Sequence, residues 1–248
     1  MTTWLDRVLA TPSVGFALKP ELYSGHDVYS AARPLFEKWS KEGEVKVRRT
    51  EDAIIFETQS GLNFTAASDK FVAEFQYRYE LKERPGLLPF IPNLEPKKYS
   101  ELSDSVIDQA AEFFDHLVNA RRRTLIRVGI VASIRIDGES PPPGVALYIK
   151  HLERPWGKPL IRCDSNLVAL LGENDKTRDQ CHHRLSFNQA EEEKKNDLRL
   201  VLDWQRVMLS PVELKSQGTA RKYLEASSLL ALEYFEKFGQ GELEYAAD

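Results

Sequence analysis

Four consecutive residues in the C-terminal half combine side chains that metal sites and phosphodiester chemistry use: Cys181, His182, His183 and Arg184. Cysteine and histidine are the preferred ligands of zinc. A histidine also serves as a general base in RNA cleavage, where an arginine stabilises the negative charge of a phosphorane. The surrounding residues 180–188 have the composition of a strand. Neighbouring side chains on a strand point to opposite faces, so only alternate members of the four converge.

A zinc site at this segment needs further ligands from elsewhere in the chain, such as Cys163, His151 or His116. The spacings typical of zinc sites, Cys-x-x-Cys or His-x-x-x-His, are missing from the sequence. We therefore predict no bound metal and no cofactor. The segment is interpreted mainly as a strand with one exposed and one packed histidine, and catalysis by His182, His183 and Arg184 is the alternative.

The strongest basic cluster consists of Arg121, Arg122 and Arg123, followed by Arg127. It lies where a predicted helix ends, and positive charges at a helix C-terminus interact favourably with the helix dipole. That interaction explains the cluster without a ligand. The other interpretation is that these arginines bind phosphate groups or an acidic partner.

Aromatic residues suggest two further kinds of contact. Phe75, Tyr77 and Tyr79 alternate along a predicted strand and would stack on bases if they faced solvent, although such a run more often belongs to the core. Trp156 lies in the short sequence Arg-Pro-Trp-Gly, and exposed tryptophans are frequent anchors of protein interfaces. We predict Trp156 and the proline-rich residues 85–96 as contact surfaces for a protein partner.

Bulk composition narrows the class of protein. Hydrophobic residues make up 42% of the 248 residues and the net charge is −4, which argues against a chain-wide electrostatic attraction to nucleic acid or anionic lipid. The sequence has no secretory signal and no apolar run of the roughly 20 residues that a membrane span requires. Its two cysteines do not indicate a disulfide scaffold. We expect a cytoplasmic protein without membrane contact.

The hydrophobic periodicity predicts an α+β fold of two antiparallel-sheet-plus-helix units packed together, with the pattern of a degenerate duplication. The units are residues 1–82, with the order β-α-β-β-β, and residues 100–240, which end in a closing helix. A proline-rich connector, residues 83–99, joins them. The expected strands are residues 13–19, 44–49, 53–58, 70–81, 124–137, 160–164, 167–171, 180–188 and 198–207. The expected helices are residues 27–41, 100–119, 143–152 and 219–238.

Three segments of the second unit resemble a family: residues 113–118 leading into the strand 126–136, the strand 197–204, and the helix 231–238. The chain is similar there to a sporadically distributed group of uncharacterised prokaryotic proteins of about this length. Members usually carry an arginine-tyrosine pair where this chain has Val131 and Ala132. The resemblance implies the fold and a prokaryotic origin, and it implies no chemistry for particular residues.

Serine hydrolase, kinase, dinucleotide and phosphate-loop motifs are absent from the sequence. We therefore predict a non-enzymatic accessory or adaptor subunit of a prokaryotic assembly, encoded with neighbouring defence or toxin genes whose products are its partners. The alternative is an RNA- or nucleotide-directed enzyme that uses His182, His183 and Arg184 together with the Arg121–Arg123 cluster.

Overall fold

The structure is a computed structural model of the whole chain and describes residues 3–20, 25–77, 79–81, 90–92, 96–120, 122–137, 140–188, 197–214 and 218–243. The N-terminal half contains η1 (Trp4–Arg7), β1 (Leu9–Leu18), α1 (Gly25–Glu42), β2 (Val45–Arg49), β3 (Ala53–Thr58), β4 (Leu62–Ala67), β5 (Lys70–Phe75), β6 (Tyr79–Leu81), β7 (Phe90–Pro92) and α2 (Tyr99–Ala120). The C-terminal half contains β8 (Arg123–Asp137), α3 (Pro143–Glu153), η2 (Arg154–Trp156), β9 (Arg162–Glu173), β10 (Thr177–Asn188), β11 (Asp197–Leu214) and α4 (Thr219–Gln240).

Within the described residues, nine strands form one antiparallel sheet in the order β2-β3-β4-β5-β1-β8-β11-β10-β9, and β6 pairs with β7 separately. Each half follows the same plan: a long strand, a helix, an antiparallel meander and a second helix. In each half the first strand pairs with the last strand of the meander, β1 with β5 and β8 with β11. The two halves join through the antiparallel β1–β8 ladder, so the predicted units share one continuous sheet.

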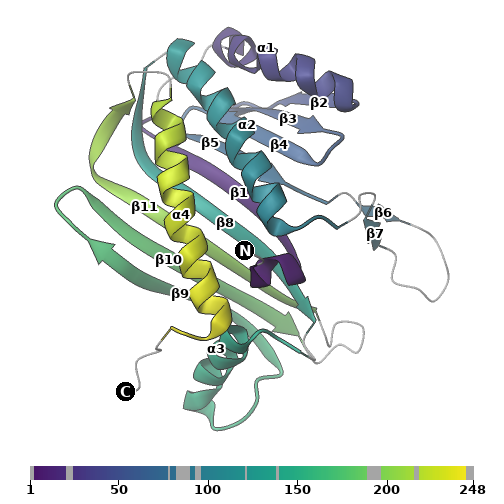
Figure 1. Cartoon of the computed structure of the whole chain (residues 1–248), viewed down its shortest axis with the longest axis vertical. Coiled ribbons are helices and arrows are strands. Elements are labelled where there is room, and N and C mark those ends of the chain that lie inside the picture. The colour runs from purple at the N-terminus through teal and green to yellow at the C-terminus, as the bar shows by residue number, and fades with distance from the viewer. Residues whose placement is uncertain are drawn as a thin grey trace.

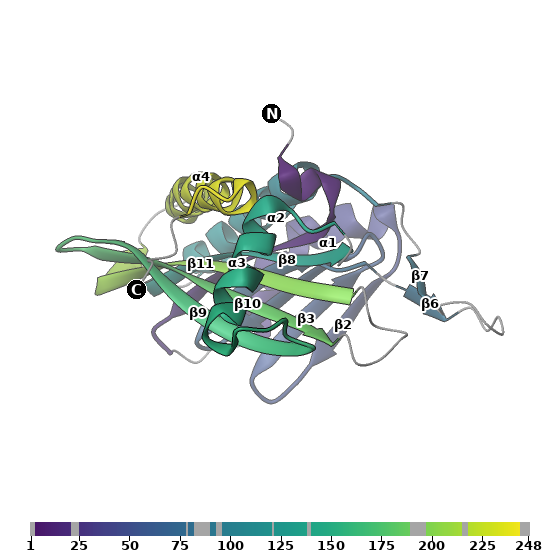
Figure 2. The ribbon, with the colours of Figure 1, turned by 90° about the horizontal axis from the view of Figure 1, so that it is seen from below.

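The helices lie on one face of this sheet (Figures 1 and 2). Helix α2 packs over β1 and β5, and α4 packs over β8 and β11. The strands alternate buried and more exposed residues, as β1 does along its whole length, because one face lies under the helices. In Figure 2 the outer strands β9 and β2 lie farther from the helix layer than the central strands β8 and β11, so the sheet curves away from the helices. We call the face without helices the open face.

The core under the helices is rich in aromatic rings. Phe113 of α2 is fully buried, and its ring lies 5.1 Å from Phe71, 5.6 Å from Phe56 and 5.7 Å from Phe64 between centroids. Edge-to-face contacts of this kind add to the stabilisation by apolar burial. Helix α2 is therefore packed closely against the strands whose other side forms the open face.

The predicted α+β fold class is confirmed, while several strand limits are wrong. Strand β4 was not expected, because its small residues give a weak hydrophobic pattern. The expected strand 70–81 ends at Phe75, and residues 79–81 pair with β7 instead. The two strands expected at 160–164 and 167–171 are one strand, β9, because Ser165 and Asn166 continue the ladder to β10.

Most of the predicted connector, residues 83–99, lies outside the described residues. The domain limits 1–82 and 100–240 remain predictions. Among the helices that the structure describes, none combines the length and the apolar composition needed to cross a membrane.

Candidate functional site

The structure divides the residues from Cys181 to Arg184 between the two faces of the sheet. Cys181 and His183 point under the helices, where they are 0% and 1% exposed. His182 and Arg184 point to the open face, and Arg184 is exposed. Alternation along β10 produces this division, because Cys181 pairs with Trp204 while His182 pairs with Asp203. The two histidines therefore do not form one site.

His183 lies in an aromatic environment beneath α4. Its Nε2 is 2.9 Å from the hydroxyl oxygen of Tyr234, and Tyr148 donates a hydrogen bond to its backbone oxygen at 3.2 Å. Its Nδ1 is buried without a hydrogen-bond partner among the described residues. Burial, and to a smaller extent His182, lowers the pKa of His183 to about 4. His183 is thus a neutral packed residue at physiological pH.

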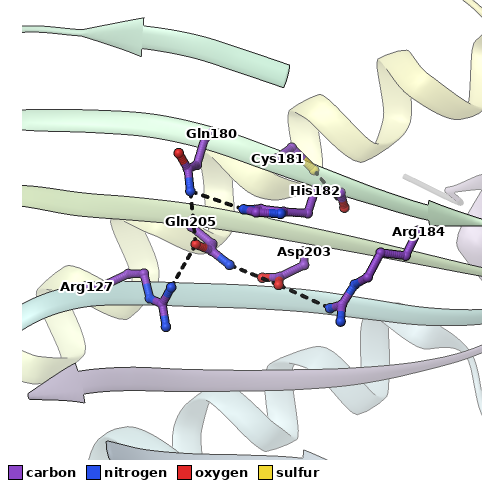
Figure 3. A network of polar contacts seen from close by, with 7 residues as sticks. All are labelled: Arg127, Gln180, Cys181, His182, Arg184, Asp203 and Gln205. Carbon is purple, nitrogen blue, oxygen red and sulfur yellow. Dashed lines mark hydrogen bonds and ion pairs between the residues drawn. The ribbon is translucent and has the colours of Figure 1, made fainter. Parts of the chain in front are cut away.

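His182 belongs to a polar network on the open face (Figure 3). The side-chain amide of Gln180 donates to His182 Nε2 at 3.1 Å and to Gln205 Oε1 at 3.2 Å. An amide nitrogen only donates, so Nε2 of His182 accepts and the proton of the neutral ring lies on Nδ1. The network therefore fixes the tautomer of His182.

Gln205 connects this part of the network to two charged residues. Arg127 Nη1 of β8 donates to Gln205 Oε1 at 3.0 Å, and Gln205 Nε2 donates to Asp203 Oδ2 at 2.9 Å. Arg184 Nη2 donates to the same oxygen of Asp203 at 3.2 Å. Gln205 is only 7% exposed, and its bonds hold the side chains of three strands in place. Arg127 and Arg184 are thus oriented before any ligand binds.

The arginine cluster predicted from the sequence does not form one surface. Arg121 lies outside the described residues. Arg122 is exposed and 3.6 Å from Glu213, whereas Arg123 is 0% exposed under the helices. Arg127 is exposed on the open face. Of the described members, only Arg122 and Arg127 are accessible, and they belong to different surroundings.

Trp156 lies in η2 and is 67% exposed. Phe75 and Tyr77 are buried, at 4% and 7%, so they are core residues; the side chain of Tyr79 is outside the described residues. Cys163 and Cys181 are both reduced strand residues. No group of three or more cysteine, histidine or acidic residues in the described part of the chain has the arrangement of a metal site.

The open face as a whole carries more basic than acidic side chains. The half-buried Arg178 of β10 lies on this face and forms an ion pair with Glu173. The exposed basic side chains are placed on it by the pairing of the strands, from one edge to the other: Lys46, Arg48, Lys70, Arg127, Arg135, Arg199, Arg184 and Arg162. Among the described side chains the acidic ones are Glu57, Glu74, Asp164, Glu173, Asp203 and Glu213, of which Asp164, Glu173 and Glu213 are exposed. Glu57 and Asp203 each contact an arginine of the same face, Arg48 and Arg184.

Sequence reasoning identified only Arg127 and Arg184 among these basic residues. The others are single charges on different strands, and they meet only through the sheet. Their signal is the alternation with buried residues, as in β5, where Lys70, Val72 and Glu74 alternate with the buried Phe71, Ala73 and Phe75. That pattern shows which residues of one strand share a face, but it does not show which strands are neighbours in the sheet.

The middle of the open face is hollowed. Gly15 of β1 and Gly129 of β8 are directly paired, and with Ser13 and Ala17 they leave a shallow depression of about 170 Å³. Lys70, Arg127, Asp203 and Gln205 are among its lining residues. A second hollow of about 300 Å³ lies farther along the same strands and is lined by Thr11, Ser133, Arg135 and Arg199, among others.

No protein-family model matches the chain, and no curated protein matches it. The chain is similar to a solved structure described as the rolling circle replication initiator protein from Geobacillus stearothermophilus, with a TM-score of 0.30 and 10% identity. That likeness covers 90% of this chain and 80% of the other. A TM-score of 0.30 is too low to assign this chain the fold or the function of that protein. The fold and the site define an α+β protein with an open, basic sheet face, and the resemblance to uncharacterised prokaryotic proteins remains a prediction.

Proposed function

We propose that the open face binds double-stranded nucleic acid through its phosphate groups. The observation that carries this proposal is the separation of charge. The chain has a net charge of −4, yet exposed basic side chains outnumber acidic ones on the open face. The excess of positive charge is therefore local to one face, as in proteins whose phosphate contacts come from a basic patch.

The positions of the charges favour an extended ligand. Lys46 and Arg48 lie on β2 at one edge, Lys70 and Arg127 lie near the middle, and Arg162 lies on β9 at the other edge. A small anion would need only one group of converging donors. Charges spread across the whole sheet match the repeated phosphates of a nucleic acid, where each contact adds to affinity through release of counterions.

The type of side chain favours a duplex over a single strand. Single-strand binders stack bases on exposed aromatic rings. Phe75 is buried in the core, Tyr77 is buried at the wall of the second hollow, and the ring that reaches the network of the open face is His182. Nine strands spaced about 4.8 Å apart span roughly 40 Å, the length of about twelve base pairs. The surface is thus large enough for one turn of a duplex.

Fluorescence anisotropy with labelled oligonucleotides of matched length tests this function. We expect duplex binding at low salt, weaker binding of the single strand, and a linear fall of log affinity with log salt concentration. An absence of duplex binding at low salt, an affinity independent of salt, or tighter binding of the single strand contradicts the proposal. His182 and Arg184, two residues of the enzymatic alternative, lie on the open face. If the protein cleaves the probe and His182→Ala abolishes this cleavage, the enzymatic alternative is favoured instead.

One observation favours a second function, that of an adaptor subunit. Trp156 exposes 67% of its surface, and large exposed rings are frequent anchors of protein interfaces. A pull-down with the products of neighbouring genes, using wild type and Trp156→Ala, tests this function separately from nucleic-acid binding.

A further inference from the structure

The two edge strands of the sheet differ in how well they are protected against pairing with another chain. Strand β2 has five residues and exposes Lys46, Arg48 and Arg49. Short length and basic side chains are the usual means by which an edge strand avoids further pairing. Strand β2 is therefore a protected edge.

Strand β9 has none of these features along its centre. It has twelve residues, and the structure describes no segment that pairs with its outer side. Val168 is 47% exposed, Leu170 is 70% exposed and Leu171 is 37% exposed. Ile161, just before the strand, is 64% exposed. A long, exposed and apolar edge strand is a template for main-chain pairing with another strand.

We propose that β9 pairs antiparallel with β9 of a second copy of this chain. The opposite charges at the two ends of β9 favour a second copy of β9 as the pairing strand. The strand begins at Arg162 and ends at Glu173, and an antiparallel copy brings the beginning of one strand to the end of the other. Opposite charges on directly facing residues stabilise such a pair.

A β-bulge determines the register. Leu170 pairs with Gln180 and Gly172 pairs with Asp179, so Leu171 is the extra residue. If Leu167 faces Leu167 of the second copy, the bulge then places Arg162 opposite Glu173 and Leu170 opposite Asp164. A centre at Val168 would place Asp164 opposite Glu173, which is a pair of like charges. The register centred on Leu167 is therefore the favoured one.

The consequence is one continuous sheet through both copies. Residues that face each other in an antiparallel pair point to the same side, so the two open faces lie on the same side of the joined sheet. The exposed Arg162 and Asn166 would then lie near the centre of a surface twice as wide. This inference concerns assembly alone and does not depend on the ligand of the open face.

Sedimentation velocity over a range of protein concentrations, without nucleic acid, tests the pairing. We expect a dimer for wild type and a shift toward monomer in Leu170→Glu, which introduces a charge opposite Asp164. The dimer dissociation constant should rise at least about tenfold. Leu229→Glu is the matched control, because Leu229 is 71% exposed on α4 and should leave the dimer unchanged.

Leu170→Lys tests the register. A lysine opposite Asp164 should preserve far more dimer than a glutamate does, although both replace the same leucine. A wild-type protein that stays monomeric at every concentration overturns the proposal. So does an equal loss of dimer in Leu170→Glu and Leu229→Glu, or in Leu170→Glu and Leu170→Lys.

Discussion

Gly15 and Gly129 face each other across the β1–β8 ladder, at the junction of the two halves of the sheet. Their surroundings differ. A Cβ added at Gly15 would lie 3.0 Å from the backbone oxygen of Phe71, whereas one added at Gly129 would meet no closer atom than the oxygen of Trp204 at 4.0 Å. A side chain at Gly15 would therefore be in tight contact with the neighbouring backbone, whereas Gly129 leaves space on the open face.

The series Gly129→Ala, Gly129→Val and Gly129→Leu should reduce duplex affinity in order of side-chain size, by about tenfold for leucine. An added Cβ meets no atom closer than 4.0 Å, and larger side chains extend into the hollow beside Arg127. Stability should hold or rise, because glycine weakens a strand interior. Anisotropy and thermal unfolding of the same samples measure both effects. An undiminished affinity in a folded Gly129→Leu protein would show that the ligand does not contact the hollow.

The stability of the protein should depend on His183 at acid pH. Its pKa is lowered to about 4 from an ordinary value of 6.5, so the unfolded chain binds a proton between these values that the folded chain does not. The stabilisation by neutral His183 is present above pH 6.5 and is lost as the pH falls toward 4. The loss is on the order of 2 to 3 kcal/mol.

His183→Phe keeps a buried ring and removes this titration. Urea unfolding at several pH values between 7 and 4 gives the dependence of the free energy of unfolding on pH for wild type and for the variant. The variant should lose less stability over this range, whatever its stability at pH 7. Parallel curves would mean that His183 titrates normally in the folded protein.

Phe113→Ala should destabilise the protein by about 3 to 5 kcal/mol, because it removes a fully buried ring from the centre of the aromatic core. Phe36→Ala is the matched control. Phe36 is 38% exposed on α1, and its loss should cost about 1 kcal/mol or less. Equilibrium denaturation by urea provides both values, and equal costs would contradict the described packing of α2 on the sheet.

Trp156→Ala should leave the free energy of unfolding nearly unchanged, since the ring is 67% exposed. If the ring fills a pocket of a protein partner, the same change should weaken that complex by on the order of 2 kcal/mol. Titration of the purified partner with both proteins distinguishes these effects. An unchanged affinity would remove Trp156 from the interface.

The helices were largely predictable from the sequence, because their hydrophobic period is local. Residues 100–119 and 219–238 were expected to be helical, and the structure has Tyr99–Ala120 and Thr219–Gln240. The β1–β8 ladder was not predictable in this way, since it joins residues more than a hundred positions apart and leaves no local pattern. Because the sequence does not reveal that ladder, it does not show that the exposed charges of different strands lie on one face.

Less of the candidate site than of the helices could be predicted from the sequence. Alternation indicated that His182 and His183 lie on opposite faces, but the sequence did not show which of them lies under the helices. Arg123 and Arg127 looked equivalent in the sequence. The structure separates them, because the β1–β8 register shifts between Leu18 opposite Leu125 and Ala17 opposite Arg127. This irregularity changes which residues of β8 reach the open face.

The most direct test of nucleic-acid binding compares two double charge reversals of equal net charge. Lys70→Glu with Arg127→Glu changes the open face, and Lys38→Glu with Lys222→Glu changes exposed positions on α1 and α4. Duplex affinity should fall about a hundredfold in the first variant, and its salt slope should decrease by about 2. The second variant should bind almost as wild type does. Equal losses in both folded variants would mean that net charge alone governs binding and that the open face is not the site.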